Sequence, residues 1–343
     1  MGIGIFWVLV AAVMLGFYAL PSKFVQNYAI ENTWGVFWLL AMLIVPVFAT
    51  TFLVDGLSAT YAQVPTTVFI YILLLSLLWG VGNLMWGISI SKIGMALGFS
   101  LLIGVGTLVG SLLPFLMGDF QKIFTPGGLF ILFGIFIIML GIIANGKAGL
   151  LRETFENQTD QTINNTKNMR TGIIMCILGG ICAAGFNLSY YVADSVGLIG
   201  QISQEQYGNP AWIARLAVML PSFIGSGIIT ITYFIIQLNK NKSWSNFQQI
   251  ESTKNIVLIA IMAVVYCTSL IIYGLGAFML GSLGTSVGFA VFQTGCIMVA
   301  NMIGIATGEW KNAGSKSKNW LLLGLIIMAL GIVIIAYGNS KMS

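Results

Sequence analysis

The sequence predicts an all-α integral membrane protein with ten transmembrane helices arranged as two inverted five-helix repeats. Of its 343 residues, 58% are hydrophobic and only 7% are charged, whereas roughly a quarter of a soluble domain is charged. Apolar runs of about 20 residues, long enough to cross the hydrocarbon core of a bilayer, recur along the whole chain. A pattern of residues in the first half also returns in the second half.

The apolar runs are expected to be helices. Each is long and evenly apolar, whereas a barrel strand would alternate polar and apolar residues over about ten positions. The ten expected spans are 3–24, 33–54, 67–90, 94–117, 127–145, 171–194, 211–238, 256–280, 285–307 and 320–337.

A single shift of 190 residues relates the two halves. The residues matched by this shift are Gly94 with Gly284, Gly98 with Gly288, Phe99 with Phe289, Gly118-Asp119-Phe120 with Gly308-Glu309-Trp310, Gly134 with Gly324, and Leu140-Gly141 with Leu330-Gly331. One shift that holds over about fifty residues indicates an internal duplication. The expected division is a first repeat at 1–145, a solvated cytoplasmic linker at 146–170 and a second repeat at 171–343.

Basic residues are concentrated in the odd-numbered connections between spans, which hold twelve of the fifteen lysines and arginines. Short loops rich in these residues stay in the cytoplasm, so both termini are expected on the outer, periplasmic face. Because five is an odd number of helices, the second repeat enters the membrane inverted. This is the plan of secondary transporters, whose binding site lies near the middle of the membrane.

The composition argues against catalysis and metal binding. The chain has four cysteines, no CxxC pair and no histidine, so buried free thiols are expected. An intramembrane enzyme would need a nucleophile with a base, or a metal cluster, on facing helices. We therefore expect no catalytic residue, metal or cofactor, and no nucleic-acid partner.

The third span carries the first candidate site. Trp79, Asn83 and Trp86 are spaced i, i+4 and i+7, which places them on one face of a helix. Two indole rings beside an amide suit a sugar ring, because they offer flat apolar surface and hydrogen-bonding groups. The alternative is that Asn83 ties two helices together.

Further polar residues occur on other spans at helical spacing. They are Asn187, Tyr190, Tyr191 and Asp194 on the sixth, Tyr266, Ser269 and Tyr273 on the eighth, and Gln293 and Asn301 on the ninth. We expect Asn187, Tyr190, Tyr273, Gln293 and Asn301 to contribute to substrate binding.

Charges inside the membrane are candidates for coupling, because a charge at the bilayer centre costs on the order of 3 kcal/mol and is usually paired or functional. Asp194 and Arg215 fall near the outer ends of the sixth and seventh spans and are expected to pair. Glu309 and its repeat mate Asp119 lie at helix ends, where a solvated turn is the alternative. Asp194 is the first candidate for proton coupling and Glu309 the second.

Over essentially its whole length the chain resembles the L-rhamnose–proton symporter family of the drug/metabolite transporter superfamily. The resemblance rests on Gly4-Ile5-Phe6-Trp7, Phe17-Tyr18-Ala19, Trp79-Gly80-Val81-Gly82-Asn83, Gly94 to Gly98, Leu220-Pro221-Ser222 and Glu309-Trp310-Lys311-Asn312-Ala313-Gly314. It implies proton-driven sugar uptake across a bacterial inner membrane, and Tyr18 joins the candidate substrate contacts. One departure is Val8, where family members tend to have a histidine, the side chain that titrates most readily near neutral pH.

Together these observations predict proton-coupled uptake of L-rhamnose or a related deoxy-sugar or small carbohydrate, with a carboxylate as the proton carrier. The expected partners are the sugar, the proton and the lipid bilayer. An exporter or a facilitated carrier of another small metabolite is the alternative. The oligomeric state and the stoichiometry stay open.

Overall fold

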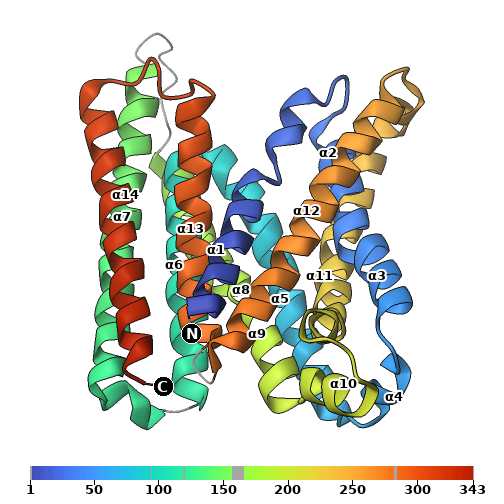
Figure 1. The fold of residues 1–343 in the computed structure, drawn as a ribbon. Coiled ribbons are helices and arrows are strands. Elements are labelled where there is room, and N and C mark those ends of the chain that lie inside the picture. The colour runs from blue at the N-terminus through green and yellow to red at the C-terminus, as the bar shows by residue number, and fades with distance from the viewer. Residues whose placement is uncertain (1, 94, 119, 157–165, 282–283, 343) are drawn as a thin grey trace. The chain divides into compact units, whose positions relative to one another are not determined.

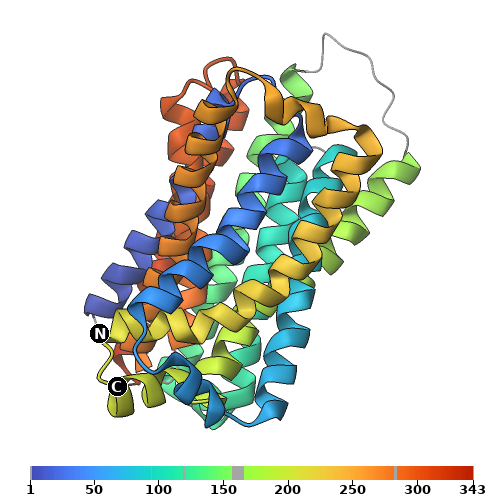
Figure 2. The same cartoon turned by 90° about the vertical axis from the view of Figure 1, so that its right-hand side faces the viewer.

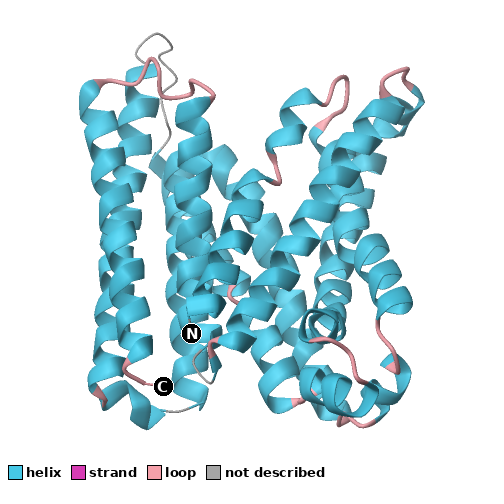
Figure 3. Ribbon diagram, in the orientation of Figure 1, coloured by secondary structure: helices cyan, strands magenta, loops and turns pink. Residues whose placement is uncertain are grey.

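The computed structural model describes residues 2–93, 95–118, 120–156, 166–281 and 284–342, and these residues form helices joined by turns, without a strand (Figure 1, Figure 3). Within the helices, the side chains at 86, 87, 90–93, 95–97, 99, 115, 118, 153–156 and 166–169 are outside this description. Nine of the described helices are long and apolar enough to cross a membrane, and Ser100–Pro114 is a shorter apolar helix. The prediction of an all-α integral membrane protein is confirmed.

The helices follow the apolar runs of the sequence. The α-helices are α1 (Gly2–Phe17), α2 (Ile30–Leu39), α3 (Val45–Leu53), α4 (Leu57–Ala62), α5 (Thr66–Ile93), α6 (Met95–Gly118), α7 (Pro126–Glu156), α8 (Thr166–Ala183), α9 (Gly185–Tyr191), α10 (Ile199–Tyr207), α11 (Ala211–Asn241), α12 (Ser252–Met279), α13 (Gly284–Ala306) and α14 (Ser315–Ser340). Three 3₁₀-helices are η1 (Leu20–Phe24), η3 (Phe120–Phe124) and η6 (Ser243–Gln248), and two π-helical turns are η2 (Leu40–Ile44) and η5 (Val192–Val196).

Two features differ from the expected spans. Helix α7 continues beyond Asn145 to Glu156, and α8 begins at Thr166, so much of the segment expected as a linker is helical. The short helices α4 and α10 occupy connections for which no helix was expected. A helix that leaves the membrane keeps its backbone hydrogen bonds, so the end of an apolar run does not mark the end of the helix.

The chain divides into two compact units, each containing residues from both halves of the sequence. Unit 1 comprises 1–12, 82–184 and 276–343, and unit 2 comprises 13–81 and 185–275. The boundaries between the two units fall within α1, within α5, between α8 and α9, and within α12. The units are described separately below.

In unit 1, α7 and α14 lie side by side and antiparallel (Figure 1). Glycines recur every seven residues on both helices, and they meet in the pairs Gly127 with Gly338, Gly134 with Gly331, and Gly141 with Gly324. A Cβ atom placed on Gly134 would lie 3.0 Å from the Gly331 carbonyl oxygen, and one placed on Gly331 would lie 3.0 Å from the Gly134 carbonyl oxygen. Small residues thus bring the two backbones into contact, as is common between membrane helices.

In unit 2, α11 packs along α2 and α3 (Figure 2). Two asparagines each fix a connecting segment, because the side-chain amide makes two hydrogen bonds to the backbone of one residue in that segment. The Asn209 amide accepts a hydrogen bond from the Asp55 N–H (3.0 Å) and donates one to the Asp55 carbonyl (2.8 Å). Asn255 makes the same pair of contacts with Gln26, at 3.2 and 2.7 Å. Because both asparagines are buried, these bonds satisfy polar groups that would otherwise be stranded.

Candidate functional site

A buried ion pair in unit 2 joins the ends of two helices. Arg215, in the second turn of α11, places Nη1 2.6 Å from Oδ1 of Asp194. The Arg215 side chain is 0% exposed and that of Asp194 is 15% exposed. A buried guanidinium is tolerated only with a partner, and the pairing expected from the sequence is therefore confirmed.

Asp194 lies in a π-helical turn, η5. Here the Gly197 N–H bonds to the Val192 carbonyl at 2.8 Å, a spacing of five residues instead of the usual four. Such widened turns are rare and occur frequently at functional sites. The turn is a reason, independent of charge, to regard Asp194 as more than a packing residue.

Tyr190 extends the ion pair into the core. Its hydroxyl donates to the Gly274 carbonyl at 2.8 Å, accepts from Nη1 of Arg215 at 3.3 Å and also lies 3.3 Å from Oδ2 of Asp194. Nearby, the Tyr273 hydroxyl donates a hydrogen bond to Oδ1 of Asn187. The sequence predicted this polar face, and the structure shows Asn187, Tyr190 and Asp194 bonded to other protein groups.

Gly200, near the start of α10, lies against the ion pair. A Cβ atom at this position would be 2.6 Å from Oδ1 of Asp194 and 2.7 Å from Cζ of Arg215. Any side chain here would displace one of the charged groups, so glycine is needed for the pair to form. Sequence reasoning missed Gly200, because no periodic signal marks it.

Aromatic rings surround the polar groups. Trp79 packs on Phe186 and Phe223, with ring centroids 4.8 and 6.2 Å away. Tyr273 lies 5.7 Å from Phe186 and 6.0 Å from Tyr190. Phe186 and Phe223 were not predicted. Helical spacing would have found Phe223, which is eight residues after Arg215 and therefore on the same face of α11.

Tyr18 belongs to a second aromatic group in unit 2. Its ring lies 5.5 Å from Phe37 and 5.2 Å from Tyr266, and Phe37 and Tyr266 are themselves 5.4 Å apart. Tyr18 is half-buried, whereas Phe37 and Tyr266 are buried.

The other candidates lie in unit 1. Asn83, Gln293 and Asn301 are half-buried, and the Asn301 amide donates to the Ile297 carbonyl of its own helix at 2.8 Å. The side chain of Trp86 lies outside the described residues, as does Asp119. Glu309, with its side chain 40% exposed, is 3.9 Å from Nη1 of Arg152.

The structure thus brings together Trp79, Asn187, Tyr190, Tyr273 and Asp194 in one cluster of unit 2. The cluster places a carboxylate, a phenol and a guanidinium within hydrogen-bonding distance of one another. The four cysteines are free thiols, as expected. Over the described part of the chain, no group of three or more His, Cys, Asp or Glu side chains is placed to hold a metal ion.

Comparison with known proteins identifies the family. The profile of the L-rhamnose-proton symport protein (RhaT) family matches residues 1–341. Proteins named L-rhamnose-proton symporter from Citrobacter koseri, Enterobacter sp. strain 638 and Salmonella gallinarum are each 24% identical over 349 aligned residues, covering 98% of this chain and 98% of each relative. This chain therefore belongs to the L-rhamnose-proton symport protein family, and it is a multi-pass membrane transporter and not an enzyme.

Proposed function

We propose that this chain is a proton-coupled transporter that takes up L-rhamnose, or a related deoxy-sugar or small carbohydrate, across the bacterial inner membrane. Family membership over nearly the whole chain supports the transport class. The relatives' name supports the sugar and the proton, at 24% identity. The observation that carries the coupling is the buried contact of Asp194 with Arg215 and Tyr190.

Asp194 is the proposed proton carrier. The chain has no histidine, so a carboxylate must change charge instead. In low-dielectric surroundings a carboxyl group is favoured in its neutral form, whereas an adjacent guanidinium favours the carboxylate. Separation of Arg215 from Asp194 would load a proton and their return would release it. Glu309 is the second candidate, and its greater exposure makes such a change of environment smaller.

The proposed substrate contacts differ in how freely their polar atoms can reach a sugar. Asn187, Tyr190 and Tyr273 are buried and hydrogen-bonded to protein groups, so we assign them, with Trp79, a supporting role within the cluster of unit 2. The half-buried candidates are better placed to contact a sugar directly; they are Tyr18, Asn83, Gln293 and Asn301. Trp86 completes the proposed set from its position on α5.

The proposed architecture is ten spans in two inverted five-helix repeats, 1–145 and 171–343, joined by 146–170, with both termini outside. The contacts of α7 with α14 support it. The shift of 190 residues converts the pair Gly134 and Gly331 into Gly324 and Gly141, which is also a contact pair. It converts Gly127 and Gly338 into Ser317 and Ala148, where the Ser317 hydroxyl donates to the Ala148 carbonyl at 2.6 Å. When the shift converts each contact pair into another contact pair, the two helices are related to each other as by a twofold axis.

The test is transport by Asp194→Asn in proteoliposomes. Uphill accumulation of L-rhamnose driven by a pH gradient should be abolished, while exchange of labelled for unlabelled sugar at equal pH should persist. Glu205→Gln is the matched control, because Glu205 is an exposed acid on the adjacent helix α10, and it should accumulate sugar normally.

Three other outcomes would contradict the proposal. Normal uphill transport by Asp194→Asn would remove Asp194 as the carrier. Loss of both transport and exchange by a folded protein would make the ion pair a fixed structural element. If wild-type protein exchanges L-rhamnose but never accumulates it, the chain is a facilitated carrier. A thermal-shift screen of monosaccharides identifies the substrate, because a ligand that binds the folded state raises its stability.

A further inference from the structure

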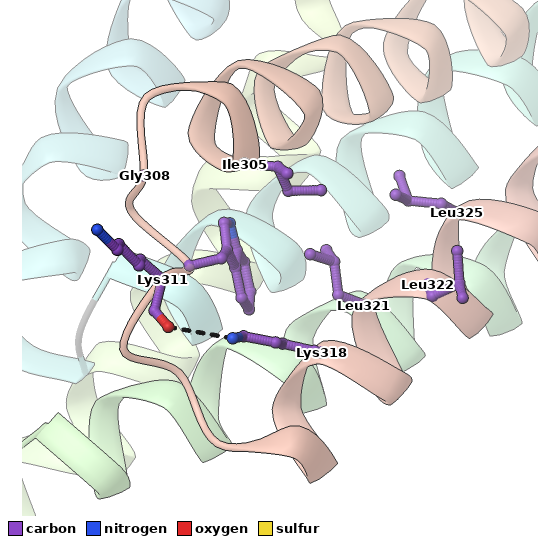
Figure 4. Close-up of a pocket in the computed structure, with 8 residues that line it drawn as sticks. Ile305, Gly308, Lys311, Lys318, Leu321, Leu322 and Leu325 are labelled. Carbon is purple, nitrogen blue, oxygen red and sulfur yellow. Dashed lines mark hydrogen bonds between the residues drawn. The ribbon is translucent and has the colours of Figure 1, made fainter.

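A pocket of about 440 Å³ lies in unit 1, where the turn after α13 meets the start of α14 (Figure 4). It is far too apolar for a sugar. Its lining residues are Ile305, Gly308, Trp310, Lys311, Lys318, Leu321, Leu322 and Leu325. The lining thus contains no carboxylate or amide side chain, the groups that usually recognise sugar hydroxyls. Its volume falls in the range of small-molecule sites, roughly 300 to 1,000 Å³.

One end of the pocket is lined by aliphatic side chains. Leu321 is buried, whereas Ile305 and Leu322 are exposed on membrane-spanning helices. In a bilayer these exposed side chains would contact lipid acyl chains. The pocket therefore offers an apolar slot that is continuous with the hydrocarbon surface of α13 and α14.

The other end is basic. Figure 4 shows Lys311 and Lys318 at the end away from Leu322 and Leu325. The Lys318 ammonium donates to the Lys311 carbonyl at 3.1 Å, which holds its positive charge at the rim. Glu309, which lies between the lining residues Gly308 and Trp310 in sequence, is 3.9 Å from Nη1 of Arg152, so its charge is offset and the described lining residues carry a net positive charge.

Trp310 forms part of the pocket wall and is held by packing on its other side. Trp310 is buried in a cluster with Ala148, Ala313 and Leu321. The guanidinium of Arg152 lies over its ring, 5.3 Å from the centroid. A tryptophan at this position suits the interface between hydrocarbon and head groups, where the amphipathic indole is favoured.

We propose that this pocket binds an anionic phospholipid, with an acyl chain along Ile305, Leu322 and Leu325 and the phosphate at Lys311 and Lys318. Basic pockets at the ends of transmembrane helices bind anionic head groups by charge complementarity. The apolar slot explains why a lipid, and not a soluble anion, is the occupant. The site is distinct from the cluster proposed for transport.

The experiment is a titration of purified protein in neutral detergent, followed by native mass spectrometry. Phosphatidylglycerol is compared with phosphatidylcholine of identical acyl chains. We expect phosphatidylglycerol to bind the wild-type protein at least tenfold more tightly. The double variant Lys311→Gln/Lys318→Gln should lose roughly thirtyfold in phosphatidylglycerol affinity, since each lysine near an anionic lipid contributes about 1 kcal/mol.

Two controls separate the site from general surface charge. Lys240→Gln/Lys254→Gln removes two exposed lysines that do not line the pocket, and it should change the affinity less than twofold. Lys311→Arg/Lys318→Arg keeps the charge and should retain binding. The proposal is overturned if both glutamine pairs weaken binding equally, if phosphatidylcholine binds as well, or if excess inorganic phosphate displaces the lipid.

Discussion

The ion pair of Asp194 and Arg215 should dominate the local stability of unit 2. Its Nη1–Oδ1 distance is 2.6 Å and the guanidinium is fully buried. Removing one partner of a buried pair strands the other and costs about 3 to 5 kcal/mol. We therefore expect Asp194→Asn and Arg215→Gln each to lower the free energy of unfolding by at least about 3 kcal/mol.

The double variant should cost much less than the sum of the two single variants, because it leaves no uncompensated charge. The cycle should then give a coupling energy of at least about 2 kcal/mol, well beyond the 0.3 to 0.5 kcal/mol within which independent sites add. The assay is reversible unfolding in mixed micelles, followed by tryptophan fluorescence.

Arg152 and Glu309 provide the matched control for this cycle. Their charges are 3.9 Å apart and their side chains are 27% and 40% exposed, so the same cycle should give about 0 to 1 kcal/mol, as for surface pairs. Additive costs at Asp194 and Arg215, or single-variant costs below about 1 kcal/mol, would refute the reasoning for the buried pair.

Three further substitutions test the packing, each by chemical unfolding. Trp79→Ala should cost about 3 to 5 kcal/mol by opening a cavity in the aromatic cluster, and a near-neutral result would mean that Trp79 is not packed. Gly331→Ala should destabilise the protein, because the new Cβ would lie 2.6 Å from a side-chain carbon of Ile138. Gly288→Ala is the control and should be neutral, because the nearest atom to its Cβ would be 3.5 Å away. Equal effects of the two substitutions would disprove the close helix contact. Asn209→Ala should cost about 2 to 4 kcal/mol through stranded backbone groups, against about 0.5 kcal/mol or less for the exposed Gln63→Ala.

The sequence was sufficient for the all-α membrane class and for the ion pair, for different physical reasons, whereas α4, α10 and the extension of α7 were not expected. Spanning helices are set by the thickness of the bilayer, so the length of an apolar run identifies them. Asp194 and Arg215 were recognisable as partners because charges within apolar runs must be compensated.

Other features needed three-dimensional information. Asn187 and Tyr273 form a polar face in sequence, but only the fold shows that the two side chains bond to each other. Position 200 requires a glycine because the charged groups of Asp194 and Arg215, which belong to other helices, lie against it. Helix α7 passes Asn145 because helix formation does not require an apolar environment. Which of the predicted substrate contacts bind sugar stays a prediction.

The contact of α7 with α14 has a consequence for the origin of the chain. Two separate copies of one protein that pair about a twofold axis bury the same patch on each copy, so residue i of one meets residue j of the other and the reverse. The pairs Gly134 with Gly331 and Gly141 with Gly324 have this reciprocity under the shift of 190 residues.

Under the duplication proposed here, the ancestor was a five-helix protein that assembled as an antiparallel homodimer through this glycine face. Such an ancestor must have inserted in both orientations, because one copy of the pair is inverted. Under the same proposal, fusion of two copies would have let each half acquire its own loop charges and a single orientation. Asp194 and Arg215 both lie in the second half, so the proposed coupling pair breaks the original symmetry, which a homodimer could not have done.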